Sequence, residues 1–192
     1  LVAVPVPAPS ALPVDGVVVA ASPAPSRKRP RPGERRVQIL QTLAAMLEQL
    51  GAERITTAAL AGRLDVSEAA LYRHFASKAQ MFEGLIEFIE SSVFTLVNQI
   101  TERESDGRVQ AARIATMLLQ FCEKNPGMVR VMVGDALVFE NERLIARMNQ
   151  FFDRLESQLR MSLRSAADAA GAATPTVQSQ ALASALTSFL VG

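Results

Sequence analysis

One short stretch of the chain, residues 56–78, has side chains whose chemistry suits contact with a polyanion. Its sequence is TTAALAGRLDVSEAALYRHFASK. Hydroxyl, imidazole, guanidinium and ammonium groups all donate hydrogen bonds to phosphate oxygens, and arginine also reaches guanine edges. Alanines allow close approach to a base pair and can contact a thymine methyl group. By this chemistry the candidate contact residues are Thr56, Thr57, Ala69, Ala70, Tyr72, Arg73, His74 and Lys78.

The apolar residues of the same stretch have the spacing of a helix-turn-helix. Thr56 is a candidate N-cap of a helix of about two turns, Ser67 of a second helix over 68–75, and Ser77 of a third. Asp65 lies at the turn, where a residue that tolerates left-handed backbone is favoured. In a DNA-binding helix-turn-helix the second helix enters the major groove. Any corner between two helices can share this apolar spacing, so the spacing alone leaves a purely structural corner open. The residues expected to form the joint core are Leu60, Leu64, Val66 and Leu71.

Charge is distributed unevenly along the chain. Residues 27–80 hold ten Lys or Arg against five Asp or Glu, whereas 81–192 hold ten against thirteen. This asymmetry suits a polyanion-binding head on a body with a different task. A basic arm at the start of the head would contact the DNA backbone or minor groove, each charge neutralising a phosphate, and the alternative is a solvated linker. Its residues are Arg27, Lys28, Arg29, Arg31, Arg35 and Arg36.

Enzyme and metal chemistry have few candidate residues here. Cys122 and His74 are the only cysteine and histidine, which excludes an intramolecular disulfide and a zinc site built from these ligands. The row Glu83, Glu87 and Glu90 could line a metal site, but no histidine joins it and a solvated helix face explains it better. Common phosphate-cradling and hydrolytic motifs are absent from the sequence. We therefore expect a cytoplasmic binding protein with no cofactor, no metal, no membrane segment and no enzymatic activity.

The hydrophobic periodicity predicts an all-α fold of about eight helices. Residues 1–26 are rich in Pro, Ala and Val and predict a disordered tail. Residues 27–80 would form the basic arm and the DNA-binding head, and 81–192 the helical body for dimerisation and partner binding. We expect helices over 37–50, 56–64, 68–75, 78 to the polar break at 104–107, 108–124, a short one after Asn125-Pro126-Gly127, 141–165, and one starting near Pro175.

Residues 56–78 resemble the signature of the TetR family of bacterial DNA-binding regulators, which closes with L-Y-[RH]-H-F-x-S-K. The resemblance extends to the nucleoid occlusion factors of that family through MFEGLIEFIE (81–90), FCEKNPG (121–127) and ALVFENERLIARMNQFFDRLESQLR (136–160), from about Arg35 to the end of the chain. It implies a TetR-like fold with a three-helix head. By position, it implies DNA-reading roles for Thr56, Thr57, Ser67, Ala69, Ala70, Tyr72, Arg73, His74 and Lys78.

The resemblance also implies a function beyond DNA binding. A homodimer would bind palindromic sites on the nucleoid in double-stranded DNA and antagonise the tubulin-like division protein FtsZ, so that no septum closes over unsegregated DNA. Contact with FtsZ would use the exposed side of the long helix around Phe88 and the loop with Lys124 and Asn125. Residues 125–127 read as a tight exposed turn, which suits a docking patch, although a structural turn has the same sequence.

One rival function stays open from the residues alone. A TetR-type repressor would respond to a small ligand bound in the body, and effector binding would shift its two reading heads apart. Such a pocket needs polar groups that point into an apolar cavity, but the expected inward faces are almost wholly apolar. The family resemblance further implies a helix beyond Gly192 that packs at the dimer interface, and its absence would weaken the dimer.

Overall fold

The computed structural model describes residues 33–49, 55–138 and 140–192, and every regular element in them is helical. The all-α expectation is therefore confirmed. The elements are α1 (Glu34–Leu47), α2 (Thr57–Arg63), α3 (Glu68–Tyr72), α4 (Lys78–Arg103), α5 (Gly107–Lys124), α6 (Pro126–Met132), a 3-10 turn η1 (Asp135–Leu137), α7 (Glu142–Ala169) and α8 (Pro175–Val191).

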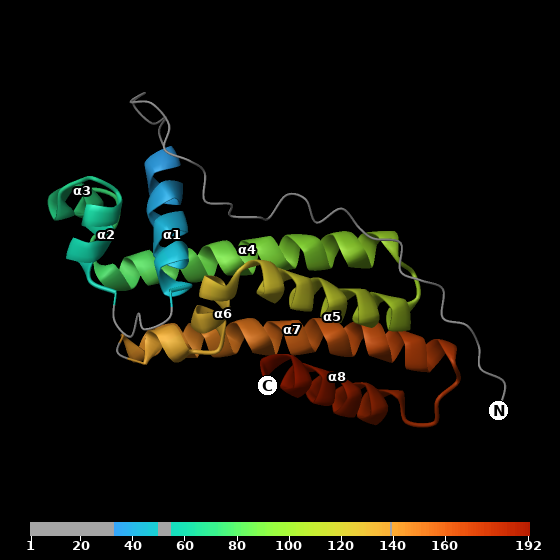
Figure 1. Cartoon of the computed structure of the whole chain (residues 1–192). Coiled ribbons are helices and arrows are strands. Elements are labelled where there is room, and N and C mark those ends of the chain that lie inside the picture. Colours follow the sequence, from blue (N-terminus) through green and yellow to red (C-terminus); the bar gives the residue numbers. More distant parts are fainter. Residues whose placement is uncertain (1–32, 50–54, 139) are drawn as a thin grey trace.

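The long helices form a body from which the short N-terminal helices project at one end. Helices α4, α5 and α7 lie side by side, and α8 packs on α7 (Figure 1). Helix α1 crosses the N-terminal part of α4, and α2 and α3 lie beside α1 (Figure 1). The first turns of α4 thus support α1–α3, while the rest of α4 belongs to the body.

The predicted N-caps of the head are confirmed. The side-chain oxygens of Thr56, Ser67 and Ser77 accept hydrogen bonds from the backbone N–H groups three residues later, at 3.1, 3.3 and 3.2 Å. Each such cap contributes about 1 kcal/mol to helix stability. The turn residue Asp65 has φ 53°, the left-handed backbone expected of it. The start of each short helix is therefore fixed by local chemistry.

Two helix ends in the head differ from the prediction. Helix α1 ends at Leu47, and the expected stop around Gly51 lies outside the described residues. Helix α3 ends at Tyr72 rather than at residue 75. After Tyr72 the chain forms a turn in which the backbone N–H groups of His74 and Phe75 both donate to the carbonyl oxygen of Leu71, at 2.9 and 3.1 Å. Phe75 enters the core from this turn and is only 1% exposed.

The segment Asn125-Pro126-Gly127 is not the exposed turn that we predicted. Asn125 is only 4% exposed, and its Nδ2 donates a 2.8 Å hydrogen bond to the carbonyl of Phe121. Pro126 begins α6, and Gly127 packs so closely on α1 that a Cβ there would lie 2.1 Å from the carbonyl oxygen of Ala44. The residues that predicted an exposed turn instead form a buried junction between α5 and α6, because the side chain of Asn125 bonds to a backbone carbonyl in the last turn of α5.

The core is continuous from the head to the body. Phe75 and Phe82 join the buried residues of α1–α3 to those of α4, and Ile114, Phe151 and Leu155 continue the cluster between α5 and α7. Helices α5 and α7 approach closely at Gly107, where a Cβ would lie 1.9 Å from the carbonyl oxygen of Ser162. None of the helices in the described ranges is long and apolar enough to span a membrane.

Candidate nucleic-acid interface

One side of helix α3 is buried in the core and the other is exposed. Leu71 is 1% exposed and fixes the helix to the core, whereas Ala69, Tyr72, Arg73 and His74 are exposed. The structure therefore brings the predicted reading residues together around one short helix. Ala70 is half-buried, and the hydroxyls of Thr56 and Ser67 cap their helices, so these two hydroxyls are already used as hydrogen-bond acceptors.

A chain of side-chain contacts connects α2 with α3. Thr57 Oγ1 donates a hydrogen bond of 2.5 Å to Glu68 Oε2, and the hydroxyl of Tyr72 donates to the same Thr57 oxygen at 3.5 Å. The predicted reading residues Thr57 and Tyr72 thus share one network with a carboxylate. The sequence analysis did not propose Glu68 as a contact residue, although its position at the start of the predicted helix over 68–75 could have indicated one.

Lys78 is engaged by the body of the protein. Its ammonium group forms an ion pair with Glu140, which precedes α7, and lies 5.6 Å from the ring centre of Phe82. The Lys78 side chain is 23% exposed and that of Glu140 is 11% exposed. A phosphate that contacted this lysine would have to compete with Glu140. The sequence could not indicate that competition, because the two residues are 62 positions apart.

Arg36 connects α1 to the end of the reading helix. Its Nη1 donates a 3.0 Å hydrogen bond to the carbonyl oxygen of His74, and its guanidinium lies 4.2 Å from the ring centre of Phe75. Arg36 is a predicted residue of the DNA-contacting arm, and in the structure it is exposed while also making these contacts within the chain. Arg35 is half-buried and donates to Gln38 at 2.8 Å. The remaining arm residues, Arg27, Lys28, Arg29 and Arg31, lie outside the described residues.

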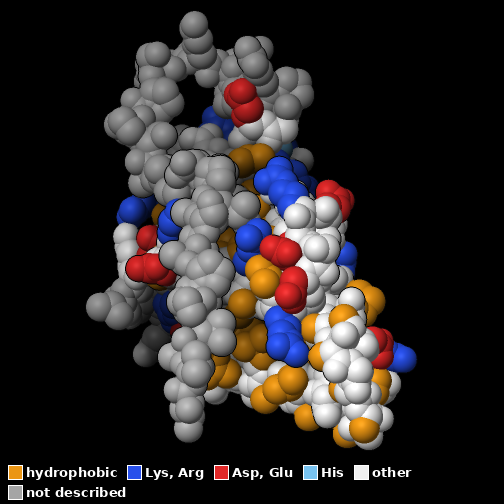
Figure 2. Space-filling view, turned by 90° about the vertical axis from the view of Figure 1, so that its right-hand side faces the viewer, with side chains coloured by type: hydrophobic (Ala, Val, Ile, Leu, Met, Phe, Trp, Pro, Cys, Tyr) orange, Lys and Arg blue, Asp and Glu red, His pale blue; other side chains and the backbone are white. Residues whose placement is uncertain are grey.

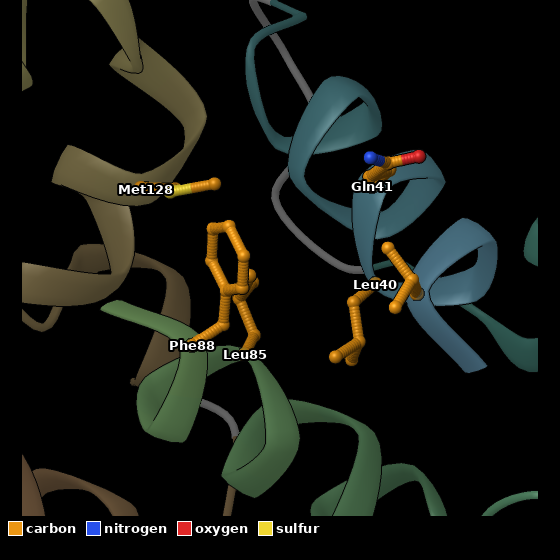
Figure 3. A pocket seen from close by; sticks show the side chains of 6 residues that line it. Leu40, Gln41, Leu85, Phe88 and Met128 are labelled. Atoms are coloured by element: carbon orange, nitrogen blue, oxygen red, sulfur yellow. The ribbon is translucent and has the colours of Figure 1, made fainter. Parts of the chain in front are cut away.

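A shallow apolar groove lies where α1, α4 and α6 meet. Phe88 and Leu85 of α4 point toward Met128 of α6, and Leu40 of α1 closes the other side (Figure 3). Phe88 is half-buried rather than fully exposed, and its neighbour Val37 on α1 is 46% exposed. Phe88 is a predicted contact residue, whereas Val37 was predicted only as the first residue of the helix over 37–50, and its residue type gave no sign that it lines a groove. The groove residues are Val37, Leu40, Gln41, Leu85, Phe88 and Met128.

The other predicted partner residues differ in accessibility. Lys124 is exposed at the end of α5. Asn125 is buried and uses its side-chain amide within the chain, so its side chain is not accessible to a partner. Of the three predicted partner residues, only Phe88 lines the apolar groove.

The acidic row on α4 is used for packing. Glu83 and Glu90 form ion pairs with Arg143 and Arg147 of α7, both at 2.7 Å. The hydrogen bond from Arg147 to Glu90 raises the pKa of this arginine, so it stays charged. The described part of the chain holds no group of three side chains suited to bind a metal ion. Burial raises the pKa of the Cys122 thiol, which lowers the population of its reactive thiolate.

Two small hollows lie beside α1 in the described residues. Within the described ranges, the groove beside Phe88 has a cavity volume of about 20 Å³, and a second hollow beside Leu43 and Ile55 holds no cavity large enough for water. Drug-sized ligands occupy pockets of roughly 300–1,000 Å³. Neither of these two hollows has the volume of a small-ligand pocket, and both are lined by residues of α1.

Helix α8 buries one side and exposes another. Ser179, Ala183 and Thr187 are buried, whereas Leu182 is 57% and Phe189 is 73% exposed. The latter two lie seven residues apart, which places them on one side of the helix. Figure 2 shows hydrophobic side chains at the surface in the lower part of the molecule, the level at which Figure 1 places α8. We call Leu182 and Phe189 the α8 stripe.

Comparisons with known proteins agree with this geometry. Residues 39–85 match the family of bacterial regulatory proteins of the tetR type, and residues 105–192 match the SlmA-like model described as a tetracyclin repressor-like C-terminal domain. The chain is 58% identical over 136 residues to the nucleoid occlusion factor SlmA of Aliivibrio fischeri strain MJ11, which covers 70% of this chain and 69% of that protein. It is 51% identical over 158 residues to that of Colwellia psychrerythraea, covering 82% and 79%.

Solved structures show the same fold at low sequence identity. A TetR-family transcriptional regulator from Bordetella parapertussis superposes with a TM-score of 0.59 at 20% identity, covering 82% of this chain and 83% of that one. A TetR/AcrR-family regulator from Thermobifida fusca gives a TM-score of 0.60 at 16% identity, covering 82% and 85%. The expected TetR-like architecture is therefore confirmed.

Proposed function

This chain belongs to the nucleoid occlusion factor SlmA proteins of the TetR family, and from that premise we propose how it performs its task. It is a DNA-binding nucleoid occlusion factor and not an enzyme. We propose that a homodimer binds palindromic chromosomal sites in the cytoplasm and, while bound, antagonises assembly of FtsZ. The observation that carries the proposal is the exposed surface of α3, with Tyr72, Arg73 and His74 beside a buried Leu71.

The proposed DNA contacts divide into two groups. Ala69, Ala70 and Arg73 would approach base edges from α3, because the N-terminal part and exposed face of a recognition helix meet the major groove. Hydroxyl, imidazole and ammonium groups would contact phosphates and set the position of the head. The proposed phosphate contacts are Thr56, Ser67, Tyr72, His74 and Lys78, together with the basic arm, whereas Thr57 donates its one O–H to Glu68 and would act through that residue.

Dimerisation would use the α8 stripe. An exposed phenylalanine and leucine on one side of a helix favour burial against another apolar surface. A two-fold interface places the same stripe of two chains face to face. Two heads related by that axis would then read two half-sites in inverted orientation, which is why we propose a palindromic site.

The apolar groove beside Phe88 is the proposed site for FtsZ. Its six residues come from the head helix α1 and from α4 and α6 (Figure 3). A short apolar segment of FtsZ would bury its side chains against Phe88, Leu85 and Met128. Lys124, exposed at the end of α5, would contribute a positive charge to the same partner, whereas Asn125 would keep its structural bond to Phe121.

The test is polymerisation of purified FtsZ, measured by light scattering. The reactions contain this protein alone, DNA fragments selected for binding it, and both together. We expect loss or remodelling of polymers only when protein and selected DNA are both present. An unchanged polymer signal, with specific DNA binding confirmed in the same tubes, would contradict the proposed antagonism.

Variants of the protein separate the two proposed surfaces. Phe88→Asp should keep DNA binding and lose the effect on FtsZ, because a carboxylate cannot be buried in an apolar groove without a partner. Lys124→Ala should weaken the effect only partly. The matched control is Leu119→Asp on α5, a leucine that is already 49% exposed and outside the groove residues.

A further inference from the structure

Glu68 is the only acidic residue of α3 and stands at its first position, exposed to solvent. DNA is a polyanion, so a carboxylate on the surface that meets it is repelled by the phosphates. Within the described residues no lysine or arginine forms a salt bridge with Glu68 that would neutralise it. The negative charge at this position opposes general DNA binding and calls for a specific role.

The carboxylate is held in a defined place. Thr57, the first residue of α2, donates a 2.5 Å hydrogen bond from Oγ1 to Oε2 of Glu68. The hydroxyl of Tyr72 lies 3.5 Å from that same threonine oxygen. A short hydrogen bond to an ionised acceptor is among the stronger ones in proteins. One carboxylate oxygen is thus fixed from α2, and the other remains to accept a hydrogen bond from outside the head.

We propose that Glu68 determines base specificity by accepting a hydrogen bond from the exocyclic amine of a cytosine in the major groove. An ionised carboxylate only accepts hydrogen bonds. Guanine and thymine present acceptors in the major groove, which repel it, whereas cytosine presents the N4 amine. Adenine also has an amine, but its N7 acceptor lies beside it and disfavours a carboxylate. Glu68 therefore selects cytosine, and Thr57 is the positioning residue that orients it.

This inference rests on the proposed DNA-binding dimer and makes it more specific. Each subunit has one Glu68, so a two-fold symmetric complex reads one cytosine in each half-site. The preferred site then contains a C·G base pair at two symmetric positions. Phosphate repulsion by the same carboxylate lowers affinity for all sequences alike, and the hydrogen bond to cytosine offsets this loss only at the preferred site.

The experiment selects binding sites for the full chain from a pool of DNA duplexes with a randomised core, at one fixed salt concentration. Glu68→Gln keeps the size of the side chain and an acceptor for Thr57, but it removes the charge and adds donors. We expect the wild-type protein to enrich a site with the symmetric C·G pairs. For E68Q, the preference at those pairs should fall at least about fivefold, and affinity for the unselected pool should rise.

Variants of Thr57 and a distant glutamate complete the test. Thr57→Val removes the hydroxyl at nearly constant shape and should lose the same preference, whereas Thr57→Ser keeps the hydroxyl and should retain it. Glu102→Gln, an exposed acid at the far end of α4, is the charge control and should leave the selected site unchanged. An E68Q site identical to the wild-type site would overturn the role of Glu68. Failure of the wild-type chain to enrich any site would instead overturn the proposed DNA-binding function.

Discussion

Arg73 is the exposed C-cap residue that follows the last residue of helix α3. We predict that Arg73→Ala weakens binding to a selected site by about 1–3 kcal/mol, because an arginine at this place contacts a guanine edge or a phosphate. Helical content should not change, since the side chain lies outside the core. A titration by fluorescence anisotropy at constant salt measures the loss. The control is Arg103→Ala, because Arg103 is the last residue of α4, at the end of that helix away from α1–α3. Equal DNA affinity of the two variants would refute the assignment of Arg73.

At Lys78 we predict a change that tightens DNA binding rather than weakening it, because this lysine forms an ion pair with Glu140 in the free protein. Glu140→Gln removes the competitor of the phosphate, so it should tighten DNA binding and steepen its salt dependence. The same change should lower the free energy of unfolding, because it breaks a partly buried ion pair. DNA titrations over a range of salt concentrations, with thermal unfolding alongside, check both effects.

The control for this prediction is a second change in the same chain. Lys78→Met in the Glu140→Gln background should abolish the gain in DNA affinity. A gain that persists without Lys78 would show that the ion pair does not compete with DNA.

At the scale of elements, Gly107 allows the backbones of α5 and α7 to approach each other closely. Gly107→Ala would place a Cβ 1.9 Å from the carbonyl oxygen of Ser162 and push α5 away from α7. We predict a loss of about 1–3 kcal/mol in the free energy of unfolding. Chemical denaturation followed by circular dichroism measures it.

Gly62 is the matched control within the same fold. A Cβ there meets no atom within 4 Å, and the residue lies inside α2. Gly62→Ala should therefore stabilise the protein by about 0.5–1 kcal/mol, the usual gain of alanine over glycine in a helix. Two substitutions of the same type should thus change stability in opposite directions. Equal effects would show that the close approach at Gly107 does not constrain the packing of α5 on α7.

Helix starts could be predicted from the sequence, whereas contacts between distant elements could not. Thr56, Ser67 and Ser77 act on backbone groups three residues away, so local chemistry determines them. The buried Asn125 was wrongly expected at the surface, because its environment depends on the packing of α6 against α1. The partners of Lys78 and Arg36 are likewise set by the tertiary fold.

The candidate site follows the same division. The motif fixed which side chains α3 would offer, because residue type and helix spacing are local properties. The groove beside Phe88 needed the structure, since its walls come from three helices and the residue type of Val37 gave no sign that it lines a groove. Glu68 was visible in the sequence, but its hydrogen bond from Thr57 crosses from α2 to α3.

At the scale of the whole molecule, the α8 stripe predicts how two chains assemble. Phe189→Asp should shift the protein toward the monomer, because it places a charge in the proposed apolar interface. Sedimentation velocity across a concentration series measures the shift, and weaker binding to a palindromic site should accompany it.

Val177→Asp is the control for the assembly prediction. Val177 is 68% exposed on the same helix but five residues from Leu182, which places it on a different side of α8. It should leave the oligomeric state unchanged. Equal sedimentation of the two variants and the wild-type chain would remove the α8 stripe from the interface.

The docking of α1 on α6 also has a consequence for biosynthesis. Gly127 lies against the carbonyl of Ala44, and Arg130 donates a 3.1 Å hydrogen bond to the carbonyl of Leu47, a residue 83 positions earlier. The ribosome completes α1–α3 well before it reaches α6, so the nascent chain has no partner for this side of α1 during that interval. Helix α1 therefore gains these contacts only after synthesis has reached α6, and a chain interrupted before α6 would leave this side of α1 uncovered.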